Sequence, residues 1–107
     1  MSNERSAEST EKVYGLLGLC MRAGQLISGE SSCELAVREG KAAMVLLDDG
    51  ASPNLLKKFQ DACAYRNVAL YLLESGCVGQ AIGKPERMVV VIRKGSIAEQ
   101  LLSLLAI

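Results

Sequence analysis

The first third of the chain carries apolar residues at helical spacing. Five of them stand at positions i, i+3, i+4, i+7 and i+8 and would form one buried stripe: Val13, Leu16, Leu17, Cys20 and Met21. This pattern predicts a helix that begins at Thr10 and ends before Gly24, since glycine is frequent just past the last turn of a helix. Residues 1–9 are polar, and we expect them to form a flexible N-terminal tail.

The middle of the chain alternates between helical patterns and apolar runs of strand length. A short extended segment at residues 25–28 precedes a second predicted helix, which ends at Gly40. Its inner face would carry Cys33, Ala36 and Val37. Three continuous apolar runs are typical of strands that are covered on both faces: residues 42–48, 68–73 and 88–92.

Two further helices complete the pattern. In the clearest one, residues 51–67, Ser52 is a candidate N-cap and Pro53 would occupy the first turn. Its buried stripe would consist of Leu55, Leu56, Phe59, Ala62 and Cys63. The other helix would close the chain at residues 96–107.

This order of elements predicts the fold class. Strands that alternate with helices imply crossover helices and parallel strand pairs, with helices on both faces of one sheet. We therefore predict an α/β fold, a three-layer α/β/α sandwich around a mixed sheet of about four strands. Residues 10–107 would form a single domain, because a chain of 107 residues has no room for a second core.

Composition excludes several classes of protein. Twelve basic residues balance twelve acidic ones, so affinity for nucleic acid would have to come from a local patch. The four cysteines contain no C-x-x-C pair and the chain has no histidine, which disfavours a metal site and favours small buried thiols. No signal-peptide pattern opens the chain, and no apolar run has the ~20 residues that span a bilayer. We therefore expect a cytoplasmic protein with reduced thiols and no membrane contact.

A glycine-rich stretch, ESGCVGQAIGKPER at residues 74–87, raises the question of phosphate binding. Only three residues separate Gly79 from Gly83, and Pro85 follows Lys84, so the spacing does not match a Walker A loop. The dinucleotide fingerprint G-x-G-x-x-G is absent as well. The stretch therefore does not predict an NTPase.

Candidate catalytic groups are few. Without histidine, acid–base chemistry at neutral pH would need a carboxylate or a lysine with a strongly shifted pKa. Asp48 and Asp49 follow a predicted strand, where α/β enzymes often place reactive groups, but they could equally begin the loop before the next helix. An acidic pair without a partner base favours the second interpretation, so we predict neither enzymatic activity nor a cofactor.

Two segments resemble the ribosomal protein L7Ae/L30e family, and within it the small bacterial YlxQ-type members: RAGQLISGESSCELAVREGKAAMVLLDDGAS and GQAIGKPERMVVVI. The order and spacing of their short motifs carry the resemblance, which extends from residue 12 to about residue 93. It implies an α/β/α sandwich and a non-enzymatic protein that binds kink-turns, which are sharply bent RNA elements with sheared G·A pairs. The implied partner is ribosomal or other structured RNA, recognised through bulges and unstacked bases.

By this resemblance, the first RNA-binding surface is the start of the second helix. Gly29 matches the family motif. The asparagine, glutamate and lysine of the motif are replaced here by Ser31, Ser32 and Leu35. A serine hydroxyl accepts a hydrogen bond without the help of a charge, and the missing lysine removes roughly one phosphate contact.

Neighbouring side chains leave alternatives open at this helix start. Glu30 could substitute for the missing carboxylate. Ser31 could instead cap the helix, because it stands in capping-box spacing to Glu34. By the family layout, Arg22 and Lys41 would lie near the helix start and add positive charge.

The second implied surface is a small-residue loop and short helix, on which extruded bases would pack. It comprises Cys77, Val78, Gly79, Gln80, Ala81, Ile82, Gly83 and Lys84. Cys77 and Val78 would give apolar contact, and the glycines would let the main chain approach the bases. Lys84 would contact a phosphate. Alternatively, the stretch is a plain connection before the last strand.

A rival hypothesis is a protein-interaction module that kept the fold and lost kink-turn recognition. It is motivated by the apolar C-terminal sequence LLSLLAI and by the residues that replace the motif: Ser31, Ser32 and Leu35. Partners that persist after nuclease treatment would favour this hypothesis.

Overall fold

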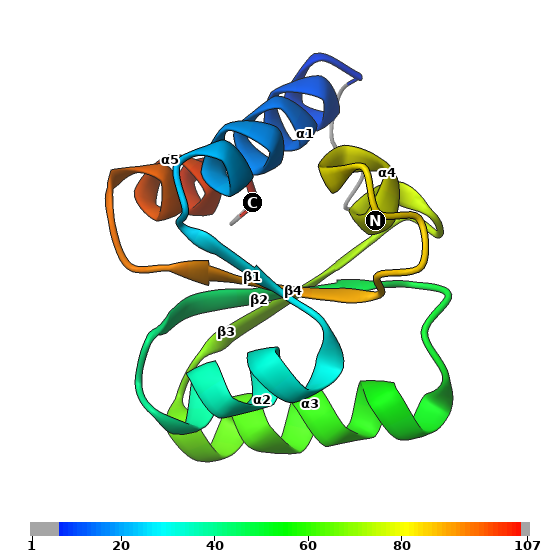
Figure 1. Cartoon of the computed structure of the whole chain (residues 1–107), viewed down its shortest axis with the longest axis vertical. Coiled ribbons are helices and arrows are strands. Elements are labelled where there is room, and N and C mark those ends of the chain that lie inside the picture. The colour runs from blue at the N-terminus through cyan, green and yellow to red at the C-terminus, as the bar shows by residue number, and fades with distance from the viewer. Residues whose placement is uncertain (1–6, 106–107) are drawn as a thin grey trace, which may run out of the picture.

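Four strands form one mixed sheet at the centre of the molecule (Figure 1). The computed structural model describes residues 7–105. The strands follow the order β1-β4-β2-β3 across the sheet, with these bounds: β1 Leu26–Ser28, β2 Ala42–Asp48, β3 Ala69–Leu73 and β4 Val89–Arg93. The predicted mixed sheet is therefore confirmed.

Helices cover both faces of the sheet, which makes the molecule the predicted three-layer sandwich (Figure 1). One face carries α1 (Ala7–Arg22), α4 (Cys77–Ile82) and α5 (Ser96–Leu105), and the other carries α2 (Glu30–Arg38) and α3 (Pro53–Arg66). Successive side chains of β2 point alternately into the two helical layers. Met44 and Leu46 pack under α1 and α5, whereas Val45 and Leu47 pack under α2 and α3.

Strand β4 runs antiparallel to both of its neighbours, β1 and β2, while β2 and β3 are parallel. The expectation of parallel pairs is therefore wrong for β4. The reason lies in α4, whose six residues span about 9 Å. For β4 to run parallel to β3, the connection through α4 would have to carry the chain back along the whole length of β3, whose five residues extend over about 16 Å. The chain instead enters β4 at the end of the sheet where β3 stops.

Helix α1 begins at Ala7, three residues before the predicted start at Thr10. Residues 1–6 of the predicted tail lie outside the described residues. Cys20, in the middle of the predicted stripe, is fully buried, whereas Met21 is 39% exposed. Met21 lies at the edge of the stripe in the last helical turn, so the prediction that it is buried is wrong.

Helix α3 starts as the sequence predicts. Ser52 is the N-cap, and its Oγ accepts a hydrogen bond from the backbone N–H of Leu55 at 3.1 Å. Pro53 occupies the first helical position, where its missing N–H costs no hydrogen bond. Phe59 and Cys63 are buried against the sheet.

The four cysteines are free thiols, of which Cys20, Cys33 and Cys63 are buried and Cys77 is half-buried. Burial raises the pKa of Cys33 to about 12 and the pKa values of Cys20 and Cys63 to about 11, so these three thiols stay protonated at neutral pH. Among residues 7–105, no three Cys, Asp or Glu side chains come together as ligands for a metal ion. None of the helices in that range has the length and apolar character needed to cross a membrane.

Candidate nucleic-acid interface

The start of α2 and helix α4 lie at the same end of the sheet, on opposite faces (Figure 1). Residues 84–87 form a turn that connects α4 to β4 there, and the backbone N–H of Arg87 donates to the carbonyl of Lys84 at 2.9 Å. The N–H of Gly29 donates to the carbonyl of Val89 at 3.2 Å, which places the start of α2 beside β4. We define the sheet-end surface as residues 29–32, 77–83 and 84–87.

The start of α2 is open to solvent. Gly29 is the N-cap, with a φ of 96° and no side-chain hydrogen bond to the helix. Ser31 therefore lies inside the first turn, and the predicted capping box with Glu34 is wrong. Ser31 and Ser32 are exposed, and the N–H groups of a first turn have no acceptor within the helix. The segment thus combines two hydroxyls with the positive end of a helix dipole.

Helix α3 engages the carboxylate of Glu30. The Nζ atom of Lys58 lies 2.7 Å from Oε2 of Glu30 and 3.2 Å from Oε1 of Glu34. The hydrogen bonds to Glu30 and then to Glu34 raise the pKa of Lys58. If Glu30 were to replace the carboxylate of the family motif, it would first have to leave Lys58. Leu35 is 46% exposed, so α2 presents an apolar group where the motif has lysine.

Arg87, which was not among the predicted residues, lies beside this helix start. A Cβ atom placed on Gly29 would be 2.7 Å from Nη1 of Arg87, so the guanidinium packs directly against the N-cap of α2. Burial raises the pKa of Cys33, which lies in the first turns of α2, and the positive charge of Arg87 lowers this pKa by a smaller amount. The only sequence signal is a basic residue in the segment before the last buried strand, and this signal does not distinguish Arg87 from Lys84.

The guanidinium of Arg87 has no hydrogen-bond partner among residues 7–105. Its Nε atom is buried, and the carboxylate oxygen of Glu86 lies 3.8 Å from it, beyond hydrogen-bond distance. The side chain as a whole is 38% exposed. A guanidinium carries five N–H donors in a planar fork. A half-buried one whose donors are unused is suited to bind an anion that arrives from solvent.

The predicted base-packing loop is a short helix, α4, bounded by Gly76 and Gly83 in the left-handed conformation. Val78 and Ile82 are 0% and 4% exposed and belong to the core under α1. The expected contact of Val78 with bases is therefore not available to its side chain. Gln80, Gly83 and Lys84 are exposed, with Cys77 and Ala81 half-buried. These positions are what the segment offers to a ligand.

Gly79 serves packing inside the protein. A Cβ atom at this position would lie 2.7 Å from the carbonyl oxygen of Lys84 and 2.8 Å from Cα of Pro85. Both are backbone atoms, so a side chain would displace the turn at residues 84–87. Gly79 is also buried, which corrects the expectation that its backbone lies open to bases. A substitution of Gly79 would therefore disturb the fold, and a loss of ligand binding in such a variant would not show that Gly79 contacts the ligand.

Asp48 holds the loops at this end of the sheet. It is 1% exposed, and its two carboxylate oxygens accept hydrogen bonds from the backbone N–H groups of Gly50 and Gly76, each at 2.7 Å. The carboxylate thereby ties the loop after β2 to the N-cap of α4. Both oxygens are used in this way, which supports the interpretation of Asp48 as a structural residue.

Arg22 and Lys41 do not lie at the start of α2. Lys41 precedes β2 at the opposite end of the sheet, and its Nζ pairs with Oε1 of Glu39 at 3.0 Å. The expectation for Lys41 fails because the nine residues of α2 separate it from Gly29 by about 13 Å. Arg22 lies toward α4 instead. A Cβ atom placed on Gly18 of α1 would be 3.5 Å from Nη1 of Arg22 and 3.8 Å from the carbonyl oxygen of Ala81 in α4.

Comparison with known proteins relates the chain to one family. The model of the ribosomal protein L7Ae/L30e/S12e/Gadd45 family matches residues 11–102. The RNA-binding protein YlxQ of Bacillus subtilis (strain 168) is 41% identical over 93 residues, which cover 86% of this chain and 93% of that protein. The RNA-binding protein YlxQ of Enterococcus faecium is 37% identical over 86 residues, covering 79% of this chain and 84% of the relative.

Two solved structures share the architecture. A Bacillus halodurans protein described as having unknown function is 32% identical with a TM-score of 0.83, over 90% of this chain and 98% of the other. The Giardia lamblia 15.5kD RNA binding protein is 19% identical with a TM-score of 0.72, over 95% of this chain and 94% of the other. At 19% identity, the similarity to the Giardia lamblia protein shows a shared fold alone.

Proposed function

The chain belongs to the ribosomal protein L7Ae/L30e/S12e/Gadd45 family, and on this premise we propose that it binds structured RNA, without catalysis, through the sheet-end surface. The relatives from Bacillus subtilis and Enterococcus faecium are both named RNA-binding proteins, which supports this proposal. The ligand would be a kink-turn in ribosomal RNA or in another structured RNA of the cytoplasm. No cofactor is needed for such binding.

The observation that carries the proposal is the guanidinium of Arg87 beside the N-cap of α2, which makes no hydrogen bond within the described part of the chain and only a 3.8 Å ion pair with the exposed Glu86. Helix N-termini and arginine side chains both favour phosphate, the first through free N–H groups and the dipole and the second through its planar fork of donors. Here they lie next to each other at one end of the sheet. A phosphate at this place would receive hydrogen bonds from both.

Arg87 also compensates for the altered family motif. Leu35 removes the positive charge that the motif places on α2, and Lys58 is occupied by Glu30 and Glu34. Arg87 restores one cation at the same helix start, from the chain segment before β4. The hydroxyls of Ser31 and Ser32 would accept hydrogen bonds from guanine N–H groups at the bend, without the charge assistance of a carboxylate.

On the other side of Arg87, helix α4 would face the unstacked bases of the RNA. Its exposed residues are small or polar, with Gln80 and Gly83 at the surface and Lys84 beyond the last turn. Single-stranded bases are recognised through their edges and faces, so a small-residue surface permits close approach. Lys84 would contact a neighbouring phosphate and add to the salt dependence of binding.

Titration with a kink-turn RNA tests the proposal. We expect the protein to bind a labelled kink-turn about tenfold or more tightly, at moderate salt, than the same RNA with its sheared G·A pairs replaced by Watson–Crick pairs. Resonance energy transfer between fluorophores on the two arms of the RNA would report the bend. Equal affinity for the two RNAs, with no change in transfer, would contradict kink-turn recognition.

A further inference from the structure

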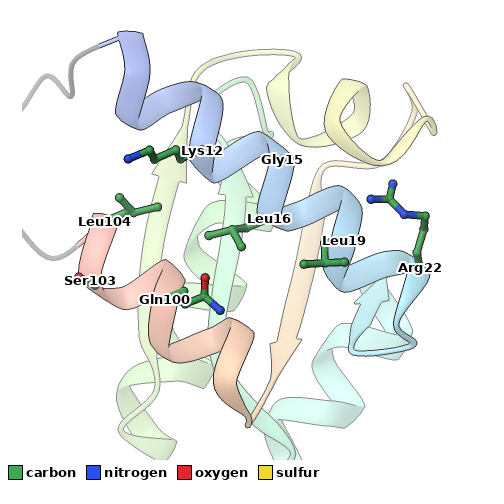
Figure 2. A pocket seen from close by; sticks show the side chains of 8 residues that line it. All are labelled: Lys12, Gly15, Leu16, Leu19, Arg22, Gln100, Ser103 and Leu104. Carbon is green, nitrogen blue, oxygen red and sulfur yellow. The ribbon is translucent and has the colours of Figure 1, made fainter.

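A second feature of the molecule lies away from the sheet-end surface, between helices α1 and α5. A groove of about 600 Å³ separates them. Figure 2 shows Leu16 and Leu19 from α1, and Gln100 and Leu104 from α5, directed into the space between the two helices. Leu19 is 43% exposed. Single exposed leucines are ordinary on a protein surface, whereas several around one hollow indicate a contact site.

The charge of the groove has one sign. Its charged lining residues are Lys12 and Arg22, and none of the described lining residues is acidic or aromatic. The two cations stand near opposite ends of the groove (Figure 2). They are ten positions apart in α1, which corresponds to about 15 Å along the helix axis. Among residues 10–105, whose side chains the structure describes, no acidic side chain forms an ion pair with Lys12 or Arg22.

We propose that this groove docks an amphipathic helix of a partner protein, with an apolar face and acidic residues. Leucines along the groove would receive apolar side chains that recur at i, i+3, i+4 and i+7 of the partner, as in other helix-in-groove contacts. Lys12 and Arg22 would pair with carboxylates about ten residues apart on the docked helix. The groove shares no residue with the sheet-end surface, although Arg22 at one end of the groove lies toward α4.

The chemistry of the groove favours such a helix over the other occupants. RNA bases stack on aromatic rings, and the described lining offers none. A second copy of the chain would bring its own Lys12 and Arg22 to the same groove, and like charges would then face each other across a self-complementary contact. An acidic helix is complementary in both shape and charge.

Gly15 adds an independent observation. It lies in the middle of α1 between the two cations, and a Cβ atom there would meet nothing within 4 Å. Packing inside the protein therefore gives no reason for a glycine, which lowers helix propensity relative to alanine. A glycine at this position lets the backbone of a docked helix come close to α1.

Binding of a synthetic peptide tests this docking site. The probe is a fluorescein-labelled helix of about 18 residues, long enough to be partly helical alone, built from leucine, alanine and glutamate with the leucines on one face. Its matched control carries lysine in place of every glutamate. By fluorescence anisotropy, we expect the glutamate peptide to bind the full-length protein at least about tenfold more tightly than the lysine peptide.

Three variants test whether the contact lies in the groove. Leu19→Glu is expected to weaken binding of the glutamate peptide at least about tenfold, while Leu72→Glu, at a residue of matching 44% exposure on β3, should leave it unchanged. Gly15→Ala should weaken peptide binding while raising the melting temperature, a combination that a purely structural glycine would not give. Circular dichroism checks that each variant is folded.

Several results would overturn the proposal. Equal affinity for the two peptides would show that charge complementarity does not contribute to binding. Equal losses of peptide affinity for Leu19→Glu and Leu72→Glu would show that the groove is not the binding site. Self-association of the wild-type protein in sedimentation experiments, abolished by Leu19→Glu, would assign the groove to a second copy of the chain.

Discussion

Replacing Asp48 with alanine is expected to lower the free energy of unfolding by about 2–4 kcal/mol. The carboxylate is buried, and its two oxygens accept hydrogen bonds from the backbone N–H groups of Gly50 and Gly76. Alanine would leave both donors without their charged acceptor and would release the loop after β2 from the start of α4. Urea unfolding followed by circular dichroism measures the change.

Two further variants give this measurement its controls. Asp49→Ala changes an exposed neighbour of the same type, and we expect it to shift stability by less than about 0.5 kcal/mol. Asp48→Asn keeps one acceptor oxygen, so its loss of stability should fall between those of the other two variants. If Asp48→Ala unfolded at the same urea concentration as Asp49→Ala, the structural role of this carboxylate would be refuted.

Replacing Arg87 with glutamine is expected to lower the affinity for a kink-turn RNA about 10- to 100-fold, which is the loss of one charge-assisted hydrogen-bonded contact. Among the residues that the structure describes, its guanidinium makes no hydrogen bond and only a 3.8 Å ion pair with the exposed Glu86, so the substitution removes no internal hydrogen bond. The slope of log affinity against log salt should fall by about 1 as well, because one phosphate contact is lost.

Lys41→Gln is the matched control for Arg87→Gln. It removes the same charge from the opposite end of the sheet, where Lys41 pairs with Glu39. We expect it to change RNA affinity less than about twofold at moderate salt, through the general potential alone. Equal losses for both variants would show that only net charge matters. An unchanged affinity for Arg87→Gln would remove this residue from the interface.

The fold could be predicted largely because its helices and strands have strong periodic patterns. The continuous apolar run at residues 42–48 required a strand covered on both faces, and Met44 and Val45 do point into different layers. The position of β4 could not be predicted in the same way. Its insertion between β1 and β2 depends on the short length of α4 and on pairing between distant segments.

The candidate site was less accessible from sequence. The family resemblance indicated the segment of α4, but it did not show that Val78 and Ile82 face the core. Arg87 lies next to Gly29 only through the pairing of β1 with β4, a contact between residues 58 positions apart. The role of Gly79 also depends on a tertiary contact, with the backbone at Lys84 and Pro85.

The most direct test of the proposed RNA site is to follow the backbone amide NMR signals while a kink-turn RNA is added to the wild-type protein. The signals that we expect to shift belong to the sheet-end surface, at residues 29–32 and 80–87, while those around Lys41 and the α1–α5 groove stay in place. Shifts concentrated in that groove or at Lys41, with the sheet-end signals unmoved, would contradict the proposed mode of RNA binding.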